Sequence, residues 1–153
     1  MQQRLPEDCW PAAGSRPELI FTIPELQYPA RLNACEQLLD RNLAAQRGGR
    51  PAILHQGRAI TFDELHAQVE TFAASLLDQG LVAGDRVLLR FWNQPEFIVA
   101  WLAALRVGGI AVATMPLLRA RELGTILGDC RPAFVITQED LWGEVEKALP
   151  AHP

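Results

Sequence analysis

The sequence predicts an α/β domain with a layered, mainly parallel sheet flanked by helices. Three observations support this fold class. Short apolar runs typical of buried strands alternate with amphipathic helical segments. The stretch from Ala83 to Met115 holds a complete strand–helix–strand unit. The composition, 49% hydrophobic and 21% charged over 153 residues, is that of one soluble globular domain with a sizeable core.

The unit between residues 83 and 115 opens with a strand predicted over residues 86–91. A helix follows, with Asn93 as its expected N-cap. Pro95 suits the first turn, and Glu96 stands three residues after the cap, where its carboxylate can reach backbone donors. The start of this helix is therefore encoded locally.

The body of this helix is expected to be buried, because alanines fill most of the face opposite its apolar stripe. That stripe is Phe97, Ile98, Trp101, Leu102 and Leu105. Gly108 and Gly109 end the helix, and a second strand is predicted over residues 110–114, before Met115 and Pro116.

Upstream, Asn33 is expected to cap a helix running to about Arg47, which Gly48 and Gly49 end. Its predicted inner side carries Leu38, Leu39, Leu43 and Ala44. This helix should pack against the body of the domain.

Two short apolar runs, residues 52–55 and 59–62, flank Gln56 and Gly57 and predict a tight hairpin. Thr61 and Glu64 form a capping box for the next helix, which ends at Gly80. Its apolar stripe is expected to cover one side of the sheet and consists of Phe62, Leu65, Val69, Phe72 and Leu76.

The C-terminal part repeats the alternation. A helix is predicted over residues 121–127 and a third buried strand over residues 133–137. Thr137 and Asp140 are expected to begin a last helix that reaches about Leu149.

Residues 1–32 are expected to form a proline-rich arm, and residues 33–153 the domain proper. Long regular elements are precluded in the arm by Pro6, Pro11, Pro17, Pro24 and Pro29. Its apolar side chains predict an extended chain laid over the body and are Trp10, Leu19, Ile20, Phe21, Ile23, Leu26 and Tyr28.

Charge and cysteine content exclude several partners. A net charge of −4 offers no footprint for nucleic acid or an anionic membrane, so neither partner is expected. The chain has an odd number of cysteines, and their spacing is not that of metal ligands: Cys9, Cys35 and Cys130. With no leader or membrane span in the sequence, the expected location is the cytoplasm.

The sequence lacks the phosphate-binding motifs of three nucleotide-binding classes. The turn Trp92-Asn93-Gln94-Pro95 is too bulky for a dinucleotide fingerprint. A Walker loop needs a lysine after glycine, but the single lysine, Lys147, lies near the C-terminus on a predicted solvated helix face. A phospho-accepting sheet needs carboxylates after its strands, where this chain has Trp92, Met115 and Gln138.

Isolated reactive side chains are assigned structural roles. His55, His66 and His152 have no spacing that brings them together, and Cys35 and Cys130 have no neighbouring histidine. The aromatic residues Phe91, Trp92, Phe97 and Trp101 either line a pocket for a flat ligand or, as we favour, belong to the core.

Residues 57–116 resemble the N-terminal part of the adenylate-forming acyl-CoA synthetases. The shared pattern is a TYxEL-like helix start at residues 60–65, GDRV at 84–87, N-x-P-E at 93–96 and LxxGG at 105–109. The flanking stretches PELQYPARLNACEQLLDR and ATMPLLRARELGTIL are similar to the aromatic-acid branch, the 2-aminobenzoate-CoA and benzoate-CoA ligases. The resemblance extends from about Pro17 onward.

The resemblance implies an incomplete N-terminal subdomain of the adenylate-forming fold. In that family ATP and Mg²⁺ convert a carboxylate to an acyl-adenylate, and the thiol of CoA then displaces AMP. This chemistry requires a Gly/Ser/Thr-rich phosphate loop with a lysine, a carboxylate for the metal, and a further lysine on a C-terminal domain. The sequence has none of these, so no catalytic, cofactor-binding or metal residue is assigned, and the chain alone is expected to bind no cofactor and to be inactive.

Two other interpretations remain open. The chain is alternatively a non-catalytic interaction module for a separately encoded remainder of the ligase, since an incomplete sheet leaves apolar edges and faces. A small independent flavodoxin-like binding domain is disfavoured, because no polar ligand loop follows the strands.

Overall fold

The computed structural model describes residues 11–15, 17–18 and 20–149, so Cys9, Trp10, Leu19 and His152 lie outside the described residues. The elements in chain order are η2 (Ala13–Ser15), η3 (Pro24–Leu26), η4 (Glu36–Asp40), α1 (Arg41–Ala44), β1 (Pro51–His55), β2 (Arg58–Thr61), α2 (Phe62–Asp78), β3 (Arg86–Arg90), α3 (Pro95–Arg106), β4 (Ile110–Thr114), α4 (Ala120–Cys130), β5 (Phe134–Thr137), η5 (Glu139–Leu141) and α5 (Trp142–Ala148). This is the predicted alternation of strands and helices.

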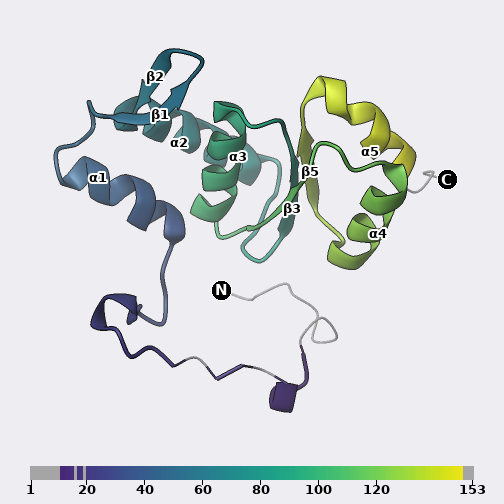
Figure 1. Cartoon of the computed structure of the whole chain (residues 1–153), viewed down its shortest axis with the longest axis horizontal. Helices are drawn as coiled ribbons and strands as arrows, with labels where there is room; N and C mark the ends of the chain where they lie inside the picture. The colour runs from purple at the N-terminus through teal and green to yellow at the C-terminus, as the bar shows by residue number, and fades with distance from the viewer. Residues whose placement is uncertain (1–10, 16, 19, 150–153) are drawn as a thin grey trace.

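A three-stranded parallel sheet of order β4-β3-β5 forms the centre of the domain (Figure 1). Leu88 of β3 lies opposite Val112 of β4 and Val135 of β5. The three segments that the sequence predicts as strands thus lie side by side, and the predicted parallel α/β architecture is confirmed. Among the described residues, β4 and β5 each have one unpaired edge.

The two faces of the sheet carry different helices. Val87 and Leu89 belong to the main apolar core with α2 and α3, whereas Leu88 is fully buried outside that core. Helices α4 and α5 pack against each other on the opposite side of the sheet from α3 (Figure 1). The buried side chains of these helices and of η5 are Leu123, Leu127, Leu141 and Val145. The domain therefore has three layers.

The hairpin and its capping box are confirmed. β1 and β2 pair antiparallel around Gln56 and Gly57. Both residues have positive φ, as a two-residue hairpin turn of type I′ requires. The hydroxyl of Thr61 accepts from the backbone N–H of Glu64, and the Glu64 carboxylate accepts from the backbone N–H of Thr61.

Helix α2 does not cover the sheet as predicted. It packs chiefly on α3 and the hairpin, so α3 rather than α2 lies directly on the sheet.

Two predicted helix starts are wrong. Helix α3 begins after Gln94, not Asn93, and Gln94 makes no side-chain capping bond. Pro95 at the first position already has the helical φ and needs no donor, which makes a side-chain cap dispensable. The last helix begins after a short 3-10 turn, η5, with Gln138 preceding it, so neither Thr137 nor Asp140 caps it.

The N-terminal helix differs from its prediction in shape. Asn33 does accept a hydrogen bond from the N–H of Cys35, 2.9 Å away, but the next five residues, η4, wind as a π-helix. A π-helix has more residues per turn than the assumed α-helix, so the predicted inner face shifts. Leu39 is buried, whereas Leu38 and Ala44 are exposed.

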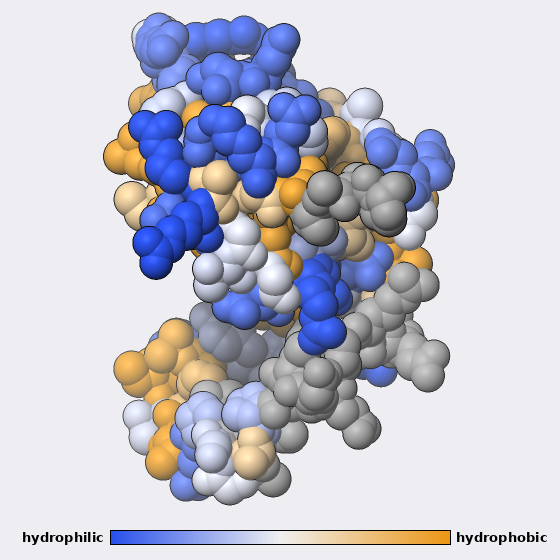
Figure 2. Space-filling model, turned by 90° about the vertical axis from the view of Figure 1, so that its right-hand side faces the viewer, coloured by the Kyte–Doolittle hydropathy of each residue, from blue (hydrophilic) through white to orange (hydrophobic). Residues whose placement is uncertain are grey.

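The described part of the arm, from residue 20 to residue 32, does not lie over the body as predicted. Its described side chains from residue 20 to residue 32 are exposed, the large apolar ones being Ile20, Phe21, Ile23, Leu26, Tyr28 and Leu32. Figure 2 shows apolar side chains, in orange, on the lower lobe that the arm forms apart from the main body. Within this lobe, Phe21 and Tyr28 make an edge-to-face ring contact.

Among the described residues, no helix is both long enough and apolar enough to cross a bilayer.

Candidate functional site

The carboxyl ends of β3, β4 and β5 form the sheet edge where open α/β sheets usually bind ligands. Trp92, Gln138 and Asp140 at this edge bond to one another. The side-chain oxygen of Gln138 accepts from the backbone N–H of Trp92 at 2.6 Å, and the indole Nε1 of Trp92 donates to Asp140 at 2.8 Å. These bonds join the end of β3 to the end of β5 and stabilise the edge.

Arg90, the last residue of β3, holds the loop after β4. It is 1% exposed, and its guanidinium nitrogens donate to the carbonyl oxygens of Met115 at 2.9 Å and of Pro116 and Leu118 at 2.8 Å. Burial lowers the pKa of Arg90, but an arginine stays charged in proteins. The Arg90 guanidinium donates to backbone carbonyls, so its role is to position the loop after β4.

The described residues do not fit ATP or Mg²⁺. No glycine-rich loop with a lysine follows any of the strands, and among these residues no group of three or more His, Cys, Asp and Glu side chains is placed to hold a metal ion. Lys147 lies on α5 and pairs with Glu144 at 2.8 Å, with 67% of its side chain exposed, as expected for a solvated face. No chemical step is therefore derived through either group.

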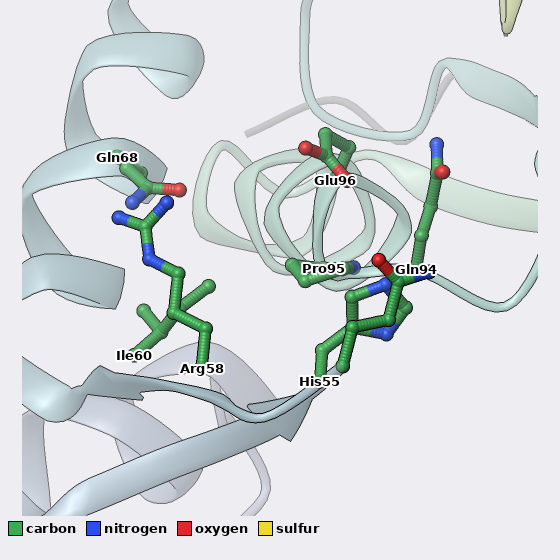
Figure 3. Close-up of a pocket in the computed structure, with 8 residues that line it drawn as sticks. His55, Arg58, Ile60, Gln68, Gln94, Pro95 and Glu96 are labelled. Carbon is green, nitrogen blue, oxygen red and sulfur yellow. The ribbon is translucent and has the colours of Figure 1, made fainter.

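A cleft of about 540 Å³ lies between the hairpin, α2 and the start of α3. Figure 3 shows Arg58 extending from β2 toward Gln68, and His55 beside Gln94. Arg58, Gln68 and Glu96 are all exposed, so solvent rather than packing surrounds them. This arrangement holds no buried charge and no fixed pair of an acid and a base.

His66 belongs to an ionic cluster that joins three helical segments. Arg106 at the end of α3 donates from both terminal nitrogens to the carboxylate oxygens of Asp40, each at 2.6 Å, and its Nε lies 2.7 Å from Glu70. His66 Nε2 stands 3.7 Å from Asp40 and 3.8 Å from Glu70. The hydrogen bonds from Arg106 hold the pKa of Asp40 below its usual value. The cluster is a structural attachment of η4 and α2 to α3.

Asn33 reinforces this attachment. Its side-chain amide donates to the carbonyl oxygens of Leu105 and Arg106, at 2.9 and 3.2 Å. These carbonyls lie in the last turn of α3, where helical partners run out, and that of Leu105 also accepts from the N–H of Gly108 at 3.0 Å.

Neither described cysteine lies in surroundings that activate a thiol. Cys35 is fully buried in the core, and burial is the main reason that the pKa of its thiol is raised. Burial likewise raises the pKa of Cys130. Because the thiolate is the nucleophile, a raised pKa opposes reactivity, in agreement with the structural role predicted for both.

The four aromatic residues do not form one pocket. Phe91 and Phe97 contact each other, with ring centroids 6.2 Å apart, and pack against the core. Trp101 lines an apolar groove beside η4 and β1, whereas the indole of Trp92 bonds to Asp140. The core interpretation holds for Phe91, Phe97 and Trp101, and Trp92 is 41% exposed.

Sequence reasoning overlooked Arg90 and Arg106. Each is a charged residue next to an apolar run that is otherwise buried, and that position is the signal that could have identified them. Their partners lie 25 to 28 residues away for Arg90 and 66 residues away for the Arg106–Asp40 pair.

The same chain is similar to enzymes that act on aromatic acids. A profile described as AMP-binding enzyme matches residues 39–153. A 3-hydroxybenzoate/4-hydroxybenzoate–CoA ligase of Thauera aromatica is 32% identical over 130 residues, which cover 80% of this chain and 25% of that relative. The chain therefore spans about a quarter of the length of this curated relative.

Two solved structures share the fold. A benzoate CoA ligase from Burkholderia xenovorans LB400 matches with a TM-score of 0.73 and 26% identity, over 80% of this chain and 24% of that one. An anthranilate CoA ligase in complex with anthranoyl-AMP matches with a TM-score of 0.73 and 27% identity, over 78% of this chain and 23% of that one. The chain belongs to the AMP-binding enzyme family, and its architecture is that of the N-terminal subdomain of the adenylate-forming CoA ligases.

Proposed function

We propose that this chain is the N-terminal part of an ATP-dependent, AMP-forming aromatic acid–CoA ligase of the benzoate or 2-aminobenzoate type. The observation that carries the proposal is the joint match of sequence and fold to hydroxybenzoate, benzoate and anthranilate CoA ligases. The complete enzyme would use ATP and Mg²⁺ to form an acyl-adenylate and CoA to form the thioester, in the cytoplasm. Residues 33–153 would supply the partial AMP-binding domain and residues 1–32 an arm.

In this proposal the chain contributes scaffolding rather than chemistry. At the carboxyl edge of its sheet, Trp92, Gln138 and Asp140 bond to one another, and the guanidinium of Arg90 holds three carbonyls of the loop after β4. The chain alone would therefore bind no ATP and activate no acid.

A fusion tests the proposal. The chain is joined to the part of the Burkholderia xenovorans benzoate CoA ligase that follows its matching quarter, and AMP release is measured with ATP, Mg²⁺, CoA and either benzoate or 2-aminobenzoate. We expect acid-dependent AMP release from the fusion and only background release from the chain alone. Robust turnover by the isolated chain, or an inactive fusion that is folded, would contradict the proposal.

The alternative function is a non-catalytic module that pairs with a separately encoded ligase remainder. The unpaired edges of β4 and β5 favour it, as do Met115 and Leu117, which are 63% and 69% exposed. Mixing the chain with the separately purified remainder should yield a complex by size-exclusion chromatography and restore AMP release. If the mixture gives neither, this alternative fails.

A further inference from the structure

Two apolar surfaces within the described part of the chain are uncovered, and one of them is a groove on the body of the domain. The groove has a volume of about 480 Å³ and lies between η4, β1 and α3. At its rim the side chains of Leu38 and Leu54 are 52% and 78% exposed. Covering such apolar surface is favourable, because it removes the surface from water. We call it the η4 groove, and its apolar lining includes Leu38, Leu39, Ile53, Leu54, Ile98 and Trp101.

The second surface is the arm lobe, which residues 20–32 form. Figure 2 shows it standing apart from the main body, and the ring contact between Phe21 and Tyr28 links its two sides. Its large apolar side chains are between 41% and 71% exposed, which corresponds to about 600 Å² of apolar surface at about 100 Å² for each side chain. These side chains are Ile20, Phe21, Ile23, Leu26, Tyr28 and Leu32. The chain thus carries an apolar projection as well as an apolar groove.

The arm lobe points away from the groove of its own copy. Asn33 fixes the root of the arm, since its side-chain amide donates to the carbonyl oxygens of Leu105 and Arg106 at the end of α3. From this root the lobe runs below η4 and α1, whereas the hairpin that forms one wall of the groove lies above them (Figure 1). Pro29 fixes its own φ and disfavours a helical bend at Tyr28. To reach its own groove, the lobe would have to reverse direction around the anchored start of η4.

A second copy of the chain offers its groove without that reversal. Because each copy has one lobe and one groove, a two-fold axis creates two identical lobe–groove contacts in one dimer. A single contact buries about 600 Å² on each side, which is less than the roughly 800 Å² per partner of a stable interface. The two contacts of an exchanged dimer together exceed that size.

We propose that the chain forms a two-fold symmetric dimer in which the arm lobe of each copy docks in the η4 groove of the other. The supporting observations are the exposed lobe, the exposed groove of matching apolar character, and the direction of the arm away from its own groove. The dimer goes beyond the proposed function and requires no ligase activity.

Sedimentation equilibrium of the chain over a concentration series tests the dimer. Leu54→Glu places a charge at the rim of both grooves and should raise the dissociation constant of the dimer at least about 30-fold. Leu77→Glu is the matched control, because Leu77 is 54% exposed on α2 but does not line the groove. This control should change the dissociation constant by about 2-fold or less, and circular dichroism should be the same for both variants. A chain that stays monomeric up to about 100 µM, or equal effects of the two variants, overturns the proposal.

A mixture of two variants distinguishes the exchange of lobes from other modes of dimerisation. Leu54→Glu disrupts the groove and Ile23→Glu disrupts the lobe, so a dimer of either variant alone loses both contacts. The mixture keeps one contact, between the intact lobe of the first variant and the intact groove of the second. The mixture should therefore associate at concentrations at which each variant alone is monomeric. A mixture that associates no more tightly than either variant overturns the exchange.

Photo-crosslinking identifies which copy supplies the lobe. The photoreactive residue p-benzoylphenylalanine replaces Tyr28, and copies with natural and with heavy nitrogen are mixed before irradiation and mass spectrometry. We expect crosslinked peptides of mixed isotope composition that join the lobe to the segments around Leu54 or Trp101. Crosslinks confined to one isotope composition, which show that the lobe folds onto its own copy, overturn the proposal, and so do crosslinks only outside the groove. Since neither mass nor crosslinks depend on activity, failure of the dimer is distinguishable from failure of the ligase assignment.

Discussion

Two arginines attach the periphery of this domain to its centre by different physical means. Arg90, on the α4 and α5 side, bonds only to neutral backbone carbonyls and is 1% exposed. Arg106 bonds to Asp40 and Glu70, whose side chains are 38% and 47% exposed. The loop at the sheet edge is thus held by hydrogen bonds from a buried guanidinium, and the N-terminal layer by an ionic cluster whose carboxylates are partly exposed. The first attachment should be strong and little affected by pH, and the second weaker and sensitive to salt and acid.

The largest effect is expected from Arg90→Met. The substitution removes three charge-assisted hydrogen bonds from a buried guanidinium to the carbonyls of Met115, Pro116 and Leu118, and each such bond is worth about 1.5 to 3 kcal/mol. We expect a loss of about 4 kcal/mol in the free energy of unfolding, measured by urea denaturation. Arg121→Met, at an exposed position of α4, is the control and should change it by about 0.5 kcal/mol or less. Equal effects of the two variants would contradict the assignment.

Arg106→Met should cost less, about 1 to 2 kcal/mol, because water screens the two carboxylates that it leaves behind. Raising the salt concentration should reduce the loss of unfolding free energy caused by Arg106→Met. It should leave the loss caused by Arg90→Met unchanged. Urea denaturation at low and high ionic strength measures both, with the exposed Arg31→Met as the control. A salt-independent cost at Arg106 would show that its role is packing alone.

Acid should separate the two attachments further. The pKa of Asp40 is lowered from 3.8 in the folded state, so its pairing stabilises the fold fully above about pH 4 and is lost as the pH falls through the folded value. The difference between wild type and Arg106→Met should therefore shrink below about pH 4. The difference caused by Arg90→Met should change less, because its hydrogen-bond acceptors are carbonyls, which do not titrate, and only the charge of the neighbouring Glu144 varies with pH. Urea titrations at a series of acidic pH values decide between these outcomes.

The smallest effect is expected from Asn33→Ala, about 1 kcal/mol. It removes the cap of Cys35 and both bonds to the last turn of α3. Asn42→Ala is the matched control, since the hydrogen bonds of the Asn42 side-chain amide are local: it donates to the Leu38 carbonyl and accepts from Arg47. Thermal unfolding should rank Asn33→Ala between Asn42→Ala and Arg106→Met. The reverse ranking would mean that the ionic cluster holds the layer without Asn33.

Features that depend on residues close together in the sequence were predicted, whereas features that depend on distant residues were not. The capping box of Thr61 and Glu64, the Gln56-Gly57 turn and the three strands depend on neighbours within a few residues, and all were predicted. The π-helical winding of η4 differs from the assumed α-helical period, and Leu38 is therefore exposed. That the Trp92, Gln138 and Asp140 groups bond to one another was not predicted, because the bonded residues lie 46 and 48 positions apart.

The sequence by itself determined the strand–helix alternation, the main apolar stripes and the family, because each is encoded in local spacing and residue type. Only the tertiary structure decided which helix covers which face, where the two arginines find their acceptors, and that α4 and α5 share a side. The physical reason is distance along the chain. A buried guanidinium takes whatever acceptors the folded backbone places around it, and residues 25 to 66 positions away leave no periodic trace in the sequence.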